Sequence, residues 1–403
     1  MADPGIVGAG ANNPADVIIV GGGLMGASAA FFLRRRGRSV ILLERGLVGQ
    51  QASGVNFGNV RRQGRYLSQL PLANRSREIW GRLPELIGED CEFVASGHLR
   101  VCYSAEYAAK AEVYARDARD YGLELEIISP GALRARFPYL GHEVLLGSLG
   151  PRDGHANPRL VAPAFGRAAR REGARVEENT EVHTIEKVGE DFLVETGNRG
   201  SFRAPILLVT AGAWAGAMAA RLGEPVPAVA RGPQMGVTEP VPYRIKPTLG
   251  VSTPHEAETI YMRQVTRGNI VFGGGNRNEV NLDTIRAYPN PENTLKQMPQ
   301  LRRLLPGIGN LQLIRVWSGI EGYLPDDLPI MGPSEKVAGL FYAFGFCGAG
   351  FQLGPAVGDV MAELIDTGAT VTPLEPFHIR RFRLNANDFL PEPDHHHARF
   401  QSE

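Results

Sequence analysis

Cysteine is scarce in this chain of 403 residues, and charge of neither sign is in excess. The three cysteines, Cys91, Cys102 and Cys347, form no Cys-x-x-Cys pair. They therefore build no disulfide framework, and a reducing, cytoplasmic compartment is expected. They also cannot supply the four thiolates of a usual iron–sulfur cluster. The 43 basic residues balance the 43 acidic ones, which gives no indication of nucleic acid or an anionic membrane as a partner.

Long apolar runs are rare as well. The uncharged stretch Val337–Gly358 contains several glycines with Gln352 and Pro355, which predicts strand, turn and helix rather than a transmembrane segment. Residues 1–14 lack the charged and apolar regions of a secretion signal. They are expected, like residues 385–403, to be a flexible tail. No pair of histidines has the spacing of metal ligands, so no metal site is expected.

The most informative segment present is Gly21-x-Gly23-x-x-Gly26, which follows the apolar run Asp16–Val20. A helix is predicted from Ala27 to about Arg36, followed by a second apolar strand that ends on Glu44. This order is typical of a dinucleotide-binding βαβ unit, in which the glycines allow a tight turn and a close approach to a pyrophosphate. Glu44 is placed to accept a hydrogen bond from a ribose hydroxyl. The flanking strand, helix and acid distinguish the motif from an ordinary glycine-rich turn.

The order strand, glycine turn and helix recurs at Leu207–Ala220 and at Gly339–Thr367. We expect the three units to contribute to one sheet, and the β-rich stretch between them to form much of a second domain. The prediction is an α/β protein with a discontinuous second domain. The predicted boundaries are 16–80, 140–224 and 317–375 for the nucleotide-binding domain, and 81–139 and 225–316 for the second domain.

Four further motifs, together with the first, resemble those of the D-amino-acid-oxidase-like flavoproteins. This family includes glycine and sarcosine oxidases, D-amino-acid dehydrogenases, and subunits of opine- and D-hydroxyproline-oxidising complexes. The resemblance covers about Asp16 to Thr367 and implies non-covalent FAD rather than NAD. It also implies a Rossmann-like FAD-binding domain and an α+β substrate domain built on a large antiparallel or mixed sheet. The four motifs are Ala52–Gly58, Thr210–Trp214, Trp317–Gly332 and Gly345–Pro355.

The resemblance also assigns residues to parts of FAD. The first motif and Glu44 are expected at the ADP half, Val182 at the adenine, and the opening of the last helix at the pyrimidine edge of the flavin. A helix N-terminus there would stabilise the negative charge that develops on reduced flavin. The predicted FAD-binding residues are Gly21, Gly23, Met25, Gly26, Glu44, Arg45, Ser53, Gly54, Asn56, Gly58, Val182, Ala211, Gly212, Trp214, Gly348, Ala349, Gly350, Phe351 and Gln352.

In this family the C–H bond beside an amine nitrogen delivers hydride to flavin N5, and the imine then hydrolyses. The implied substrate is a D-amino acid, an imino acid such as D-hydroxyproline, or an opine-type secondary amine. The sequence departs from the family at Glu321, where the amino-acid oxidases place an arginine that binds the substrate carboxylate. Glu321 is predicted to bind a substrate ammonium or guanidinium; the alternative is an ion pair with a nearby arginine.

A second departure is Gln352, at the position where sarcosine-oxidase-like enzymes carry a lysine thought to meet oxygen. It favours a dehydrogenase that passes electrons to a partner, and iron–sulfur subunits of a hetero-oligomer could then supply the relay. The alternatives are an oxidase that produces H2O2 and a non-catalytic subunit that holds FAD.

The substrate carboxylate needs other partners. Tyr261 and Arg263 share one face of a predicted strand and are candidates for a clamp, with ordinary cross-strand pairing as the alternative. Arg61 and Arg62, which follow the Ala52–Gly58 loop, are the other candidates. Cys347 is interpreted as a small buried thiol rather than a covalent flavin link.

Overall fold

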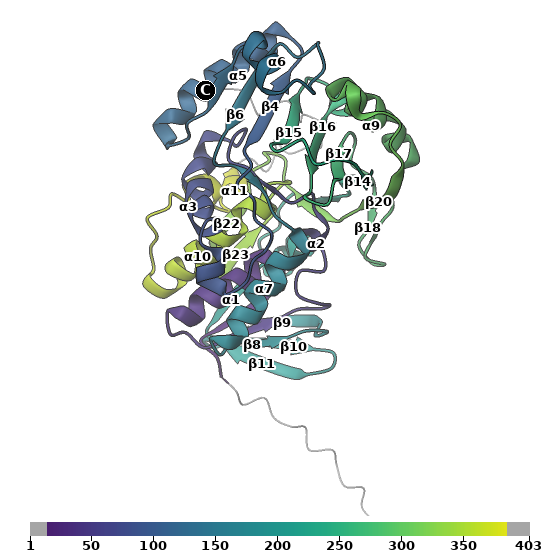
Figure 1. Ribbon diagram of the computed structural model, residues 1–403. Helices are drawn as coiled ribbons and strands as arrows, with labels where there is room; N and C mark the ends of the chain where they lie inside the picture. The colour runs from purple at the N-terminus through teal and green to yellow at the C-terminus, as the bar shows by residue number, and fades with distance from the viewer. Residues whose placement is uncertain (1–13, 385–403) are drawn as a thin grey trace, which may run out of the picture.

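The computed structural model describes residues 14–384 and contains two large sheets (Figure 1). The first is six-stranded and contains strands from all three of the strand–turn–helix units that were predicted to share one sheet. β1, β2, β8, β12 and β23 run parallel, and β22 is antiparallel at one edge. In spatial order the strands are β22 (Ile330–Pro333), β23 (Leu340–Phe344), β12 (Ile206–Val209), β1 (Val17–Val20), β2 (Val40–Leu43) and β8 (Arg175–Glu177).

The two faces of this sheet pack against different layers because side chains alternate along each strand. Val17 and Ile19 face a helical layer, and Ile18 and Val20 face the sheet of β9–β11 together with α8. The helical layer comprises α1 (Leu24–Arg35), α3 (Leu70–Trp80), α4 (Leu83–Ile87), α7 (Pro158–Arg171) and α10 (Gly350–Thr367). The opposite layer comprises β9 (Val182–Val188), β10 (Asp191–Thr196), β11 (Gly200–Ala204) and α8 (Ala215–Arg221).

The second sheet is eight-stranded and mixed, as predicted. β4 and β15 are parallel at its centre, and the other neighbours are antiparallel. Its core packs against α9 (Pro291–Leu304) through Leu301 and Leu304. Its strands are, in order, β20 (Leu313–Ser318), β14 (Gln234–Pro240), β17 (Asn269–Gly274), β16 (Ile260–Gln264), β15 (Thr248–Ser252), β4 (His98–Cys102), β6 (Leu146–Gly150) and β5 (Glu126–Ile128).

The sheet differs from the predicted domain boundaries at β6. The prediction assigns residues 140–224 to the nucleotide-binding domain, but Leu146–Gly150 pairs with β4 in the eight-stranded sheet. Its sequence Leu-Gly-Ser-Leu-Gly lacks the β-branched residues that mark a strand, so the alternation is not evident. β20 also crosses the predicted boundary between residues 316 and 317. The division into two domains otherwise remains a prediction.

Local signals account for several helix ends. Asn157 followed by Pro158 is a sequence signature that predicts a helix start. In the structure Asn157 caps α7 by accepting a hydrogen bond from the Arg159 N–H at 3.1 Å. α10 ends at Gly368, whose φ of +77° suits glycine. The helical periodicity from Pro71 to about Leu86 predicts one helix, but the structure divides it into α3 and α4, because Pro84 lacks the N–H that would continue α3.

The remaining helices and strands are short, apart from the 13-residue helix α5. They are α2 (Ala52–Val55), β3 (Asn59–Val60), α5 (Ala105–Asp117), α6 (Pro130–Arg136), β7 (Gly154–His155), β13 (Val229–Arg231), β18 (Val280–Asn281), β19 (Arg286–Ala287), β21 (Glu321–Tyr323) and α11 (Arg381–Leu384).

None of the helices within residues 14–384 combines the length and apolar character needed to cross a bilayer. The predicted flexible tails lie outside the described residues, apart from Pro14.

Candidate cofactor and substrate site

A cavity of about 1060 Å³ extends between the two large sheets. Its lining runs from Gly21 and Glu44, at the carboxyl ends of β1 and β2, to Gly348 and Phe351 at the start of α10. It then reaches β15 and β16 of the eight-stranded sheet. The carboxyl ends of parallel strands are where open α/β sheets bind ligands. The volume is at the upper end of the range for ligand pockets, which suits a cofactor and a substrate together.

The glycines of the first motif form a cradle that any side chain would fill. Gly21 has a φ of +108°, and a Cβ on it would lie 2.6 Å from the Thr210 carbonyl oxygen. A Cβ on Gly26 would clash with the Gly21 carbonyl, so α1 packs directly on β1. Ser53 Oγ accepts a hydrogen bond from the Leu24 N–H at 2.8 Å and ties the next loop to the start of α1. The helix N-terminus therefore faces the cavity as a phosphate site would require.

Glu44 lies at the end of β2 and lines the same part of the cavity. Its two carboxylate oxygens accept hydrogen bonds from the Gly22 N–H at 2.6 Å and the Gly46 N–H at 2.7 Å. A carboxylate has lone pairs for about four hydrogen bonds, so Glu44 can still accept from a ribose hydroxyl.

Arg45 and Trp214 lie against one another at this end. The Arg45 guanidinium carbon is 4.2 Å from the Trp214 ring centroid. Val182, Ala211 and Gly212 line the cavity together with them, and Met25 lines it from the first turn of α1. These residues thus border the part of the cavity next to Glu44, where the adenine half of FAD is predicted to bind.

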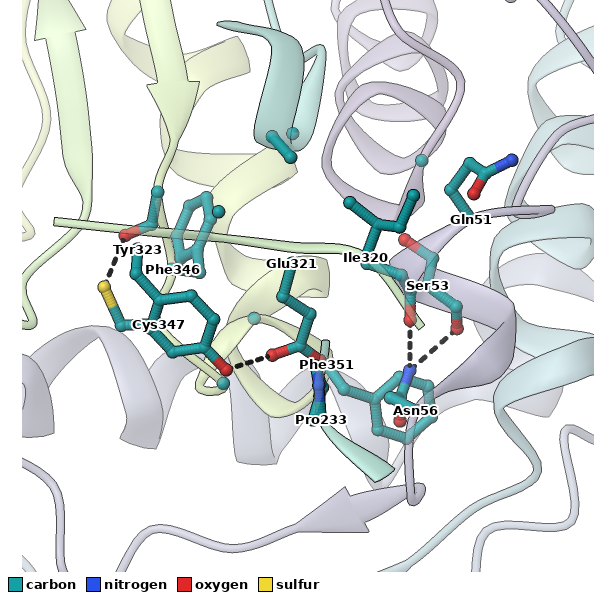
Figure 2. A pocket seen from close by; sticks show the side chains of 18 of the residues that line it. Gln51, Ser53, Asn56, Pro233, Ile320, Glu321, Tyr323, Phe346, Cys347 and Phe351 are labelled. Atoms are coloured by element: carbon teal, nitrogen blue, oxygen red, sulfur yellow. Dashed lines mark hydrogen bonds between the residues drawn. The ribbon is translucent and has the colours of Figure 1, made fainter. Parts of the chain in front are cut away.

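The loop after β2 shapes the middle of the cavity, and Figure 2 shows how Asn56 secures it. The Asn56 amide donates to the carbonyls of Ala52 and Ser53, both at 2.9 Å, and its Oδ1 accepts from the Gly58 N–H at 2.7 Å. Ser53 and Asn56 line the cavity, whereas Gly54 and Gly58 do not. A Cβ on Gly54 would clash with the Gly49 carbonyl, so these two glycines allow close backbone packing behind the loop.

The start of α10 forms a further part of the cavity wall. Gly348, Gly350 and Phe351 line the cavity, whereas Ala349 is buried beside it and its carbonyl accepts a hydrogen bond from Arg65 Nη2 at 3.2 Å. The N-terminus of an 18-residue helix therefore adjoins the cavity, where it would stabilise negative charge on a bound flavin.

Gln352 lies elsewhere than predicted. It is fully buried outside the cavity, and its amide donates to the Ala73 carbonyl of α3 at 2.9 Å. One position further along the helix turns this side chain by about 100° from Phe351, toward the helical layer. The side chain thus has no contact with the cavity, and the roles of Gln352 toward FAD and oxygen stay predictions.

Glu321 lines the cavity from β21, and its carboxylate points toward the Tyr323 hydroxyl in Figure 2. Tyr323 donates to Glu321 Oε2 at 2.9 Å. The Arg277 guanidinium lies over the Tyr323 ring at 4.4 Å and pairs with Glu256 at 3.2 Å. Burial raises the pKa of Glu321, although Tyr323 and the Arg277 charge act in the opposite direction. The carboxylate therefore faces the cavity beside an arginine, and both predicted roles retain support.

Tyr261 and Arg263 share one face of β16, but their side chains end in different places. Tyr261 lines the cavity, and burial raises its pKa to about 12. Arg263 is buried outside the cavity, where its Nε donates to the Phe57 carbonyl at 2.9 Å and its Nη1 lies 3.2 Å from His155 Nδ1. The structure thus places the Arg263 guanidinium against the Ala52–Gly58 loop, which it holds in place, and not in the cavity where the predicted clamp would need it.

The two arginines that follow the Ala52–Gly58 loop, Arg61 and Arg62, also lie in different surroundings. Arg61 lines the cavity, and its role at a substrate carboxylate stays a prediction. Arg62 is buried and pairs with the buried Asp153 at 3.1 Å, so it fixes the backbone instead. Among residues 14–384, no group of three or more His, Cys, Asp or Glu side chains is placed to hold a metal ion.

Sequence reasoning missed five residues at the substrate end of the cavity. They come from β4, from the segment after Arg62, from the segment after β17 and from β21, and the topology that brings them together has no local signal. The missed residues are Arg65, His98, Arg100, Arg277 and Tyr323.

A dinucleotide cradle, an acid for a ribose and a helix N-terminus at the far wall define a flavin-dependent oxidoreductase with its substrate site against a second sheet. The chain belongs to the family described as DAO, FAD dependent oxidoreductase, whose profile matches residues 16–364. The FAD cofactor and the amine- or amino-acid-oxidising class predicted from the sequence are thereby confirmed.

The chain aligns with individual relatives over nearly the whole length of each. The chain is 28% identical to glycine oxidase of Geobacillus kaustophilus, over 91% of this chain and 97% of the relative. It is 26% identical to one of the subunits of opine oxidase from Rhizobium meliloti, again over 91% and 97%. The crystal structure of L-proline dehydrogenase from P. horikoshii superposes with a TM-score of 0.86 at 27% identity, covering 92% of this chain and 98% of that one.

Proposed function

We propose that this protein dehydrogenates the C–N bond of a small amino or imino acid, or of an opine-type secondary amine. The observation that carries the proposal is the continuous cavity that joins the FAD cradle at Gly21 and Glu44 to a charged compartment containing Glu321 and Tyr261. Bound FAD would supply the hydride acceptor. The chain has to bind the amine, orient its C–H bond and exclude water.

Glu321 is proposed to receive the substrate ammonium. Its carboxylate faces the cavity beside the start of α10: a Cβ on Gly348 would lie 3.7 Å from Oε2. Because burial raises its pKa, Glu321 is a better proton acceptor than an exposed glutamate, and it can take the ammonium proton that must leave before hydride transfer. Tyr261 is proposed to align the substrate, and Arg61 to bind a carboxylate.

A partner rather than oxygen is proposed as the electron acceptor. The support is the likeness to a relative named as one subunit of an opine oxidase and to a structure named as a dehydrogenase. Iron–sulfur subunits would provide the relay in such a hetero-oligomer. The likeness to glycine oxidase supports the alternative, an oxidase that releases H2O2. The three free cysteines, all buried, are compatible with the proposed reducing, cytoplasmic compartment.

The test is anaerobic mixing of the purified holoenzyme with D-amino acids, D-hydroxyproline, sarcosine, iminodiacetate and opines, while the visible flavin absorbance is followed. Bleaching by at least one compound is expected, and it should persist when air is admitted. Rapid recovery in air would instead identify an oxidase. A holoenzyme that no amine bleaches would contradict the proposal and favour a non-catalytic FAD-holding subunit.

A further inference from the structure

Residues 275–290 connect β17 to α9 and contribute to the wall of the cavity without joining a hydrophobic core. None of these residues is buried, and the segment contains only the two-residue strands β18 and β19, which pair with one another as a hairpin over residues 280–287. A lone two-stranded hairpin is marginally stable in water. The position of this hairpin therefore depends on the contacts at the ends of the segment and at its tip.

Gln234 of β14 holds both ends of the segment. Its side chain is buried, and its Oε1 accepts hydrogen bonds from Asn278 Nδ2 at 2.9 Å and from the Asn290 N–H at 2.7 Å. Its Nε2 donates to the Asn290 carbonyl at 3.2 Å and to the Thr294 hydroxyl at 2.7 Å. The Asn278 backbone also pairs with that of Gly232, just before Gln234. One amide thus joins the two ends of the segment to the eight-stranded sheet.

The tip of the 280–287 hairpin reaches the cofactor end of the cavity. Leu282, Asp283 and Ile285 line the cavity, and the Leu282 carbonyl accepts a hydrogen bond from Trp214 Nε1 at 3.4 Å. The Trp214 ring lies against the Arg45 guanidinium, where the adenine half of FAD is predicted to bind. The hairpin therefore extends from the eight-stranded sheet to the cofactor side of the molecule and covers that part of the cavity.

Ile285 has a backbone conformation that indicates a role for its side chain. Its φ is +55°, in the left-handed region that β-branched residues rarely adopt. Glycine would take this conformation without strain, yet the position carries an apolar side chain that lines the cavity. Strained backbone of this kind is found at ligand clamps and switch regions. The tip thus has the features of an element that closes on a ligand.

We propose that Gln234 is a positioning residue for FAD. By joining Asn278 to Asn290 it holds the 280–287 hairpin closed over the cofactor, and slow release of FAD depends on that closure. Both N–H groups of its amide donate and its carbonyl oxygen accepts twice, so the amide has no hydrogen bond left for a ligand and acts through the hairpin. The inference holds whichever amine the enzyme oxidises.

The first test shortens the hairpin. Val280 and Ala287 are direct cross-strand partners, so Asn-Gly in place of residues 281–286 can close the chain between them. The change removes the tip and keeps both ends that Gln234 holds. The rate of FAD release is followed by flavin fluorescence after dilution of the holoenzyme. It should rise about tenfold or more, while the Tm of the FAD-free chain stays unchanged because the tip joins no core.

The second test is Gln234→Met, which removes the amide and keeps the length of the side chain. Release of FAD should accelerate about tenfold in the full-length chain and no further in the chain with the shortened hairpin, because both changes remove the same closure. The matched control is Gln264→Met. Gln264 is a buried glutamine of the same sheet that binds the backbone of residues 241–245 outside the cavity. Both variants should lower the Tm, and only Gln234→Met should speed release.

Hydrogen exchange of the unmodified protein provides a measurement without any variant. Amides of residues 280–287 should exchange more slowly with FAD than without it, and Gln234→Met should lose this protection.

Four results would overturn the inference. They are unchanged FAD release from the chain with the shortened hairpin, additive acceleration by the two changes, equal acceleration by Gln264→Met, and equal exchange of residues 280–287 with and without FAD. Circular dichroism identifies a variant that fails to fold, and the exchange experiment then decides.

Discussion

Replacement of Glu321 by glutamine removes one charge and almost no volume from the cavity wall beside Tyr323. The glutamine side chain could still accept the hydrogen bond that Tyr323 donates at 2.9 Å, so the local packing is expected to persist. The substrate ammonium would lose its anionic partner. A hydrogen bond to a charged group in a partly dry site is worth ~2–3 kcal/mol, so kcat/KM should fall by about 30- to 150-fold.

The pH dependence distinguishes a chemical role of Glu321 from a structural one. Because its pKa is raised, kcat/KM of the unmodified enzyme should decline as pH falls through a value above 4.5, and this limb should be absent in Glu321→Gln. A raised pKa also means that ionisation of Glu321 opposes folding, increasingly as pH rises above 4.5. The FAD-free variant should therefore have a higher Tm than the unmodified protein at pH 7.

The assay is the rate of anaerobic flavin reduction over a range of substrate concentrations and pH, with Glu143→Gln as control. Glu143 is exposed and pairs with Arg303 on the surface, so its variant should match the unmodified enzyme. Unchanged reduction kinetics in Glu321→Gln would refute the reasoning. In that case Glu321 would act only as the partner of Tyr323 and Arg277.

Three further predictions concern the cofactor cradle and its support. Gly26→Ala should reduce the FAD bound per chain several-fold, because its Cβ would lie 2.6 Å from Thr210 Oγ1 and clash with Gly21; Gly131→Ala, where a Cβ meets nothing within 4 Å, should retain full FAD. Arg263→Met should speed FAD release and leave the substrate KM unchanged, since Arg263 donates a hydrogen bond to the Phe57 carbonyl. A raised KM with normal FAD retention would instead indicate that Arg263 binds the substrate. Burial, with the Arg263 charge, lowers the pKa of His155 from 6.5 to about 3, so stability should fall as pH drops below 6.5. Urea unfolding at pH 7 and pH 5 should show a smaller loss in His155→Gln, and an equal loss would contradict this assignment.

The cofactor half of the molecule was largely predictable because its signals are local. The Gly21–Gly26 turn, Glu44 and the cap at Asn157 each depend on residues close in sequence, and all three lie where they were expected. Side-chain direction was not predictable. Arg263 shares a face of β16 with Tyr261, yet its long side chain carries the guanidinium outside the cavity. Gln352 is one helical position beyond Phe351, and its side chain therefore points away from the cavity toward α3.

The polar residues on β4 were beyond sequence reasoning for another reason. His98 meets the segment that follows β3 through the side chain of Gln63, which lies 35 positions earlier in the chain. Nothing in the local pattern of either segment encodes that pairing. Sheet topology likewise brought β6 into the eight-stranded sheet against the predicted boundary.

The most direct test of the central claim is a deuterium isotope effect on anaerobic flavin reduction, with an opine-type secondary amine labelled at the carbon beside nitrogen. The account predicts that reduction proceeds, that the label slows it several-fold, and that the imine hydrolyses to an oxo acid and a smaller amine. Reduction without an isotope effect would contradict hydride transfer as the slow chemical step. Binding without any reduction would contradict the amine-oxidising function itself.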